Sequence, residues 1–386
     1  MHTVRVHRKG ANRVSSGHPW IFSSDVLDRG QAKGGEAVVV VEPRGNAIGT
    51  AHYSDSSQIS LRMLSDRVET IDRAFYLRRM GLAEAHRKRV VTDSEAYRLI
   101  HGEGDQLPGL VIDRYGDYFT LQTLDQGMDA AKAEIVSCLE ELFAPKGMAE
   151  RNDVAVRKRE ALPLQAGVLM GEIPATIMVR MNGLNLHADL LHGQKTGIFL
   201  DQRENYVAAA RYGRGRALDC FTSTGGFALH LASRCETVEA VDSSEAALAI
   251  ARMNCDANGI PNVELREADV FELLAGHAAG RRHFDIVVLD PPAFAKSRQS
   301  LEAAIGGYRE INRRALELLG SGGILVTCSC SHHLSEAALL EIIAAASLDT
   351  GRKLRVLERR MQSQDHPVLL TVPETLYLKC LILEVI

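Results

Sequence analysis

The segment "LVTCSCSHH" (325–333) contains two cysteines, Cys328 and Cys330, at the end of a predicted buried strand. In α/β enzymes the carboxyl ends of parallel strands carry the ligand-binding and reactive groups. If the extended geometry continues, alternation of side chains directs both thiols to the same side. Free cysteines, however, are among the most buried residue types and usually only fill space. The pattern therefore leaves two interpretations open, a nucleophile or a pair of small apolar fillers.

Acidic residues end three successive strands that precede these cysteines. The stretch "ALDCFTSTGGFALHLA" (217–232) predicts a strand, a glycine turn and a helix, a geometry in which the backbone can approach a nucleotide closely. The next strand ends at Asp242, about where an acid binds ribose hydroxyls, and the third ends at Asp269, where an acid can accept from an adenine amino group. Each acid alone is more often a helix cap or a surface turn. Together they indicate a nucleotide-like cofactor.

A fourth strand ends in "VVLDPPAF" (287–294), in which Asp290 precedes two prolines. Proline cannot donate to a strand ladder, so the chain must leave the sheet there and hold the Asp290 carboxylate at its rim. A nicotinamide cofactor would use the same crevice, but a rigid acid at this position suits a transferring methyl group. The motif therefore points to S-adenosylmethionine as the cofactor.

A methyl transfer gives a thiol a role when the acceptor is cytosine. The ring carbon C5 of cytosine is not nucleophilic until a group adds at C6. Addition of a cysteine thiolate makes C5 enamine-like, C5 takes the methyl group, and loss of the C5 proton with elimination restores the ring. Asp290 is the candidate acid that stabilises charge near N3 during the addition.

The composition describes an ordinary globular protein. The chain has 386 residues, 46% hydrophobic and 24% charged residues and a net charge of −4, so we expect two or three domains and no global basic field. Basic residues cluster locally, near the start of the chain and in "RKRV" (87–90), and such runs are usually solvated faces. Seven scattered cysteines without paired C-x-x-C spacing argue against disulfides and against a metal site. Without a long apolar run, we expect a cytoplasmic protein that does not enter a membrane.

Strand and helix patterns divide the chain into three predicted domains. Residues 1–70 alternate short β-branched runs with Gly and Pro and predict a small β-rich domain, and residues 71–180 mix helix and strand signals and predict a small α+β domain. In residues 181–386 strand and helix patterns alternate, which is typical of a parallel sheet with helices on both faces; the last strand is expected to be antiparallel.

The chain resembles the bacterial large-subunit ribosomal RNA methyltransferases of the RlmI-like family, which make 5-methylcytosine. The resemblance covers nearly the whole chain and is specific, because several separate motifs match in order. These are "SGHPWIF" (16–22), "GEGDQLPGLVIDRY" (102–115), "ERNDVAVRKREAL" (150–162), "GQKTGIFLDQREN" (193–205), "LDPPAFAKS" (289–297), "GGILVTCSCS" (322–331) and "QDHPVLLTVPETLYLK" (364–379).

The resemblance implies a PUA-like β-barrel at 1–70, an α+β middle domain at 71–180 and a class I, Rossmann-like, seven-stranded methyltransferase domain at 181–386. It implies that Cys330 is the catalytic cysteine, because it lies seven residues after Gly323, and that Asp290 is the partner acid. Cys328 is then a filler. Implied cofactor contacts come from Phe199, Gln202, Asp219, Phe221, Thr224, Gly225, Gly226, Asp242, Asp269 and Asp290. The chain departs from the family pattern at Ile198, Tyr206 and Ser223.

The implied activity is methylation of C5 of a cytosine in large-subunit (23S) ribosomal RNA, with the base turned out of its loop into the crevice. The implied partner is that RNA, and the β-rich first domain offers a surface for a homodimer. Two alternatives stay open: methylation of an exocyclic base amine, which needs no thiol, and a non-catalytic role in binding ribosomal RNA during assembly. The aromatic residue that commonly follows Pro-Pro in amine methyltransferases is Ala293 here, which argues against the first alternative.

Overall fold

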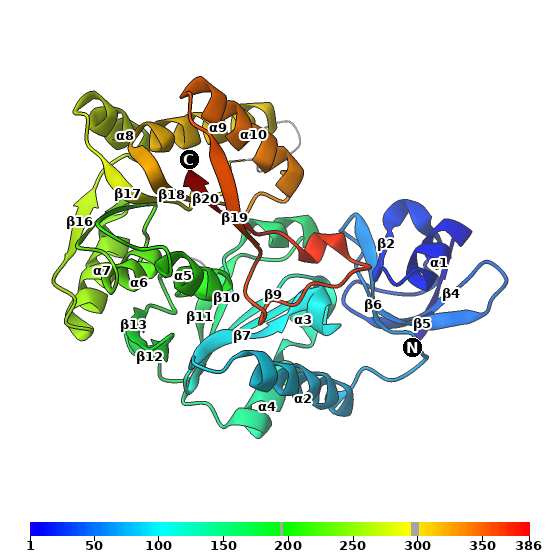
Figure 1. The fold of residues 1–386 in the computed structure, drawn as a ribbon. Helices are drawn as coiled ribbons and strands as arrows, with labels where there is room; N and C mark the ends of the chain where they lie inside the picture. Colours follow the sequence, from blue (N-terminus) through cyan, green and yellow to red (C-terminus); the bar gives the residue numbers. More distant parts are fainter. Residues whose placement is uncertain (194–195, 295–300) are drawn as a thin grey trace. The chain divides into compact units, whose positions relative to one another are not determined.

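The computed structural model describes residues 1–193, 196–294 and 301–386, which form two compact units (Figure 1). Unit 1 contains Met1–Arg180, Ala188–Ile198 and Gln364–Thr375, and unit 2 contains Met181–His187, Phe199–Ser363 and Leu376–Ile386. The hairpin of β12 (Ile177–Met181) and β13 (Leu184–Ala188) lies where the chain passes from the first unit to the second. No helix in the described ranges is both long and apolar enough to cross a bilayer.

The beginning of unit 1 is a six-stranded sheet with the strand order β2-β6-β5-β4-β1-β3. The strands are β1 (His2–Val6), β2 (Trp20–Phe22), β3 (Val26–Asp28), β4 (Ala37–Val41), β5 (Ala47–Tyr53) and β6 (Ile59–Ser65). Alternating valines of β1 and β4 are fully buried and form a core with Ile21 and Leu61. The predicted β-rich fold is thereby observed, together with a helix that the sequence did not indicate.

That helix is α1 (Arg8–Ser15), within a stretch where we expected strands and turns. Gly10 is its only buried residue, and Ala11 and Val14 are its only partly buried hydrophobic residues that pack on the core, so its apolar side is too short to be recognised. A Cβ atom on Gly10 would lie 3.0 Å from Ile21 Cγ2, so the missing side chain lets the helix lie against the sheet. The position of α1 therefore depends on the close approach of its backbone to the sheet.

The middle part of unit 1 is a five-stranded sheet with the order β11-β10-β9-β8-β7, packed with helices (Figure 1). Its elements are α2 (Arg73–Val90), β7 (Ala96–His101), β8 (Leu110–Tyr115), β9 (Tyr118–Thr123), α3 (Gln126–Ala130), α4 (Lys132–Phe143), β10 (Gly147–Asn152) and β11 (Gln165–Gly171). Tyr115 and Tyr118 pair across a two-residue turn, which agrees with the hairpin predicted at "YGDY". The boundaries of three separate domains stay a prediction.

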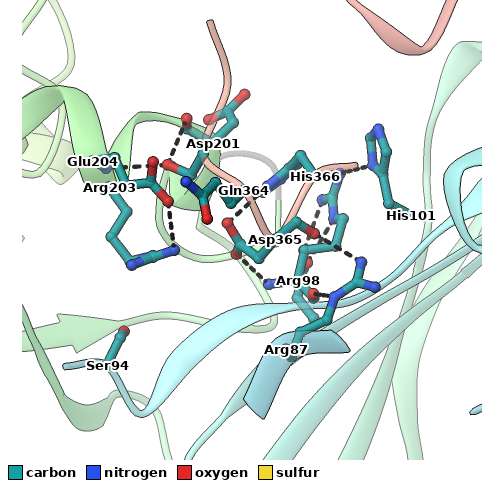
Figure 2. A network of polar contacts seen from close by, with 12 residues as sticks. Arg87, Ser94, Arg98, His101, Asp201, Arg203, Glu204, Gln364, Asp365 and His366 are labelled. Atoms are coloured by element: carbon teal, nitrogen blue, oxygen red, sulfur yellow. Dashed lines mark hydrogen bonds and ion pairs between the residues drawn. The ribbon is translucent and has the colours of Figure 1, made fainter. Parts of the chain in front are cut away.

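In the basic run at the end of α2, Lys88 and Arg89 are exposed as expected, but Arg87 is buried. Arg87 is 1% exposed, and its guanidinium pairs with both carboxylate oxygens of Asp105 and donates to the Asp365 carbonyl oxygen at 2.8 Å. Figure 2 shows Arg87 and Arg98 directed at the 364–366 segment, where the Arg98 backbone N–H donates to Asp365 Oδ2 at 2.9 Å. The His101 and His366 rings pack 5.1 Å apart beside this network. Arg87 therefore holds a distant segment of the chain within unit 1.

We expect Arg87→Met to lower the stability of unit 1 by about 3–5 kcal/mol, because it leaves the buried Asp105 carboxylate without its partner. Calorimetric melting temperatures of the full chain measure this effect. The matched control is Arg89→Met, two residues further along α2, where the side chain is exposed and little change is expected. Equal melting temperatures for the two variants would contradict a structural role for Arg87.

Unit 2 is a seven-stranded sheet with the order β16-β15-β14-β17-β18-β20-β19. The strands are β14 (Arg216–Cys220), β15 (Thr237–Asp242), β16 (Val263–Glu267), β17 (Phe284–Leu289), β18 (Leu319–Ser329), β19 (Leu354–Arg360) and β20 (Lys379–Val385). The helices are α5 (Arg203–Ala210), α6 (Gly226–Ala232), α7 (Glu245–Ala257), α8 (Val270–Ala279), α9 (Leu301–Glu317) and α10 (Glu336–Asp349). The first five strands in this order are parallel, and β20 runs antiparallel to β18, as predicted.

This strand order brings the predicted site together. The reversal of strand order lies between β14 and β17, and ligands of such sheets bind at the carboxyl ends of the strands near that point. The strand centres are fully buried apolar runs, such as Ile286–Leu289 in β17, because helices cover both faces of the sheet. The polar residues that follow these runs therefore meet at one edge.

Candidate active site

The turn from β14 to α6 has an unusual backbone. Phe221, Ser223 and Gly225 have positive φ angles of 64°, 49° and 89°. Two of these three residues are not glycine, so the surrounding contacts must hold the strained conformation. Asp219 does this, because its Oδ2 accepts hydrogen bonds from Thr222 Oγ1 at 2.6 Å and from the Ala228 backbone N–H at 2.9 Å. The turn is therefore held in one shape before any ligand binds.

Gly226 opens α6 directly above the ring of Tyr206. A Cβ atom on Gly226 would lie 2.4 Å from Tyr206 Cζ, which no packing tolerates. The buried Tyr206 ring also packs edge-on against Phe227 at 4.8 Å, and its hydroxyl donates to the Phe199 carbonyl oxygen at 3.2 Å. Tyr206, a departure from the family pattern, thus links the turn to the segment where Phe199 and Gln202 lie.

Asp242 closes the other side of the turn. One of its carboxylate oxygens accepts from the Ser223 backbone N–H at 2.8 Å and the other accepts from the Ser244 N–H at 2.9 Å. Asp269, by contrast, caps α8 and accepts from the Glu272 N–H at 3.0 Å. The structural role that we weighed for these acids is thus present at Asp269, and its contact with a cofactor stays a prediction.

Burial and neighbouring charges change the pKa of Asp219 at this edge. Burial raises the pKa of Asp219 to about 7, with further raising by the charges of Asp290 and Asp242 and partial compensation from the Thr222 hydrogen bond. Among the described residues, Asp219 Oδ1 and Ser223 Oγ are buried without a hydrogen-bond partner. Acceptors and clustered negative charge of this kind suit a ligand with hydroxyl groups and a positive centre, which S-adenosylmethionine has in its ribose and its sulfonium. The site therefore fits the cofactor that the sequence indicated.

Other predicted cofactor residues lie in the same unit. Gln202 ends the short η4 helix (Leu200–Gln202) and accepts from Asn205 Nδ2 at 2.6 Å, and the Thr224 carbonyl oxygen accepts from Asn254 Nδ2 at 3.0 Å. Phe294, the last described residue after Asp290 in this segment, packs on Tyr308 with ring centres 4.8 Å apart. Residues 194–195 and 295–297 of the matched motifs lie outside the described residues.

The two cysteines of β18 have different environments. Cys328 is fully buried opposite Cys380 of β20, and burial raises the pKa of its thiol well above the ordinary value. The strand ends at Ser329, so Cys330 lies just beyond it and is partly exposed, whereas the other six cysteines of the chain are buried. A buried neutral thiol is inert, so Cys330 is the cysteine better placed for chemistry.

Two residues that sequence reasoning missed surround Cys330. The Tyr308 hydroxyl of α9 bonds the hydroxyl groups of Ser329 at 2.9 Å and Ser331 at 3.1 Å, which fixes the backbone on both sides of Cys330. Lys379 begins β20, and its ammonium donates to the Ser331 carbonyl oxygen at 2.7 Å. The matched stretch "LYLK" contained Lys379, but only the pairing of β20 with β18 shows which residues it faces.

Comparisons with known proteins agree with this geometry. Residues 4–66 match the model of a PUA-like domain, and residues 98–379 match that of the S-adenosylmethionine-dependent methyltransferases. The chain is 42% identical over 371 residues to a Klebsiella pneumoniae protein named ribosomal RNA large subunit methyltransferase I, covering 94% of this chain and 93% of that protein. An Escherichia coli O157:H7 protein of the same name is 40% identical, with 94% of both chains covered.

The chain belongs to the family of ribosomal RNA large subunit methyltransferase I. The fold also agrees with a solved structure described as a SAM-dependent methyltransferase from Streptococcus mutans, with a TM-score of 0.84, 21% identity and 100% of both chains covered. Another solved structure with the same TM-score is a complex with SAH. The PUA-like domain, the class I methyltransferase fold and S-adenosylmethionine as the cofactor are thereby confirmed.

We expect cofactor binding to strengthen as the pH rises through about 7. Below this pH Asp219 is protonated in the cofactor-free protein, and a bound cation favours the ionised form, so binding releases protons. If the cofactor lowers the pKa of Asp219 by one unit, affinity at pH 8 is roughly fivefold higher than at pH 6. Calorimetric titration in buffers of different ionisation enthalpy measures both quantities. Asp219→Asn is the control, and an unchanged proton release in that variant would assign the release to another group.

Gly226→Ala is expected to weaken cofactor binding and to cost about 1–3 kcal/mol of stability, because its methyl group must displace the Tyr206 ring. Gly276→Ala within α8 is the matched control, since nothing lies within 4 Å of the added atom. The control should be neutral or slightly stabilising. Melting temperatures and cofactor titrations of the two variants check the difference, and equal behaviour would show that Tyr206 can move aside.

Proposed function

We propose that this protein transfers a methyl group from S-adenosylmethionine to C5 of a cytosine in large-subunit ribosomal RNA, through a covalent bond between Cys330 and C6. The name shared by its relatives supports ribosomal RNA of the large subunit as the substrate. The PUA-like domain at 4–66 supports binding to RNA. The observation that supports the cytosine chemistry is the position of Cys330, the one partly exposed thiol. Cys330 follows β18, and Asp290 follows the neighbouring strand β17.

The proposed chemistry assigns one task to each group. The Cys330 thiolate adds to C6 and the electron pair of the C5–C6 double bond moves toward N3, where Asp290 stabilises the developing charge. The cofactor supplies an electrophilic methyl group, which C5 takes. Removal of the C5 proton by a base then expels the sulfur from C6 and restores the aromatic ring. The thiol is regenerated, so the enzyme is ready for another turnover.

The structure gives physical support for the choice of Cys330 over Cys328. A nucleophile must reach the base, but Cys328 is 0% exposed in β18, where it pairs with Cys380 of β20. Burial also raises the pKa of the Cys328 thiol, which lowers the fraction of it that is ionised. Cys330 is partly exposed, and the serines on both sides hold its backbone in place through Tyr308.

We expect Cys330→Ala to abolish methyl transfer to ribosomal RNA, by more than about a thousandfold, because C5 of cytosine is not activated without addition at C6. Cys328→Ala is the matched control in the same strand and should keep most of its activity. Transfer of labelled methyl from the cofactor to RNA from cells that lack the gene measures both variants.

Two further measurements separate the alternatives. Bisulfite sequencing of ribosomal RNA from cells with and without the gene should show one cytosine that loses protection when the gene is absent. Mass mapping of the product nucleoside should find the methyl group on a ring carbon. A methyl group on nitrogen, or full activity of Cys330→Ala, would support the amine reaction instead, and cofactor binding without turnover on any ribosomal RNA would support an assembly role.

A further inference from the structure

Lys379 is a buried cation in unit 2 that the proposed reaction has not yet used. Its residue is 6% exposed, and its ammonium donates to two backbone carbonyl oxygens, of Ser331 at 2.7 Å and of Tyr377 at 2.9 Å. In the described part of the chain no carboxylate lies within 4.0 Å of this ammonium. Burial of a charge without a counter-charge is costly, so such a group is retained where an anion forms nearby.

The position of Lys379 identifies that anion. Lys379 pairs with Ser329 across the β18–β20 ladder, and its ammonium bonds the carbonyl of Ser331, so it holds the residues on both sides of Cys330. Burial lowers the pKa of Lys379 to about 8, and the charges of Cys330 and Glu336 raise it in part. Because the ammonium bonds the carbonyl of the residue next to Cys330, a thiolate on Cys330 would lie near a positive charge.

We propose that Lys379 is a positioning residue that stabilises the Cys330 thiolate, an inference that rests on the proposed cytosine reaction. In this step the S–H bond breaks, the electron pair stays on sulfur, and the proton passes to solvent through the exposed side of Cys330. The ammonium then pairs with the thiolate and keeps it ready for addition to C6. When the C–S bond forms, the sulfur becomes neutral and no longer attracts the ammonium. Lys379 therefore stabilises the thiolate more than the adduct, and this stabilisation must be small enough for the addition to proceed.

The other groups around the pair do not replace this cation. Tyr308 of α9 is a neutral hydroxyl bonded to Ser329 and Ser331, and burial raises its pKa. Glu336 of α10 is the acid that raises the pKa of Lys379, but it already forms an ion pair with Arg359 of β19.

Three further groups complete the electrostatic surroundings. The Asp290 charge acts on the Cys328 thiol, which burial keeps neutral, and the Cys380 thiol of β20 lies opposite Cys328. The His332 ring packs 5.7 Å from the Tyr377 ring.

The test measures the ionisation of Cys330 directly, without RNA. The rate of alkylation by iodoacetamide, followed at the Cys330 peptide by mass spectrometry, reports the thiolate fraction at each pH. The other six cysteines are buried, so the signal is specific. In the wild-type protein the alkylation midpoint should lie below the ordinary thiol pKa of about 8.5. A midpoint at or above that value overturns the proposal, whatever the variants do.

Lys379→Met should move the midpoint upward by about one unit or more and slow alkylation at pH 7 roughly tenfold, whereas Lys379→Arg should keep most of the effect. The matched control is Lys353→Met, because Lys353 precedes β19 at the other end of the β19–β20 ladder, where Leu354 pairs with Val385. If Lys379→Met unfolds, the wild-type midpoint and the Arg variant still decide the matter.

The pH profile of methyl transfer separates this role from a structural one. In Lys379→Met the lost activity should return as the pH rises toward 9, while a merely structural defect lowers the rate equally at every pH. An unchanged alkylation midpoint in Lys379→Met overturns the proposal. If instead Cys330→Ala keeps full methyl transfer, the cytosine reaction fails, and the alkylation midpoints still report whether Lys379 acts on the thiol.

Discussion

The site of this protein depends on the antiparallel pairing of the last strand, β20, with β18. Parallel strands bring only their carboxyl ends to the edge where ligands bind. Because β20 runs the other way, its first residue, Lys379, arrives at that same edge opposite Ser329. The final strand of the chain thereby supplies a cation next to the partly exposed Cys330, at an edge where the parallel strands supply acids.

The charges at this edge are arranged in two groups. Around the glycine turn, burial and then the charges of Asp290 and Asp242 raise the pKa of Asp219, and this arrangement leaves a place for a positively charged ligand. Around the end of β18, the buried ammonium of Lys379 lies among backbone carbonyl groups and neutral hydroxyls. Both arrangements cost stability in the free protein, and both become favourable when a charge of the opposite sign is present. We infer that the positive charge of the methyl donor stabilises the acids around the glycine turn, and that the negative charge of the thiolate stabilises the buried ammonium of Lys379.

The connection between β19 and β20 leaves unit 2, contributes a segment to unit 1 and returns. The chain leaves unit 2 after Ser363, forms the Gln364–Thr375 segment of unit 1, and returns at Leu376. Within unit 2 both ends of this excursion bond to Asp201: Ser363 through the Asp201 carbonyl oxygen at 2.8 Å and Tyr377 through Oδ2 at 2.8 Å. Within unit 1 the buried Arg87 holds the excursion itself. Lys379 follows two residues after Tyr377, so the contacts of Asp201 within unit 2 also help to determine where β20 begins.

Some features were readable from the sequence because they depend on local pattern. Alternating apolar runs and helical periods predicted the parallel sheet and its antiparallel last strand, and "YGDY" predicted its hairpin. Glycine spacing and acids after strands predicted the cofactor turn. The helix α1 was missed, because only Gly10, Ala11 and Val14 pack on the core and so short an apolar side gives no clear helical period. In the "RKRV" run only the burial of Arg87 was not foreseen, because its partner Asp365 lies far away in the chain.

The sequence by itself determined which residue types stand at the ends of strands, and hence the fold class, the cofactor and the candidate thiol. Only the tertiary structure decided which of two cysteines is accessible, that Asp219 is buried near enough to Asp290 and Asp242 for its pKa to be raised, and which cation lies near Cys330. The physical reason is that burial and electrostatic interaction depend on distance in space. Residues such as Ser329 and Lys379 become neighbours only when β18 and β20 pair.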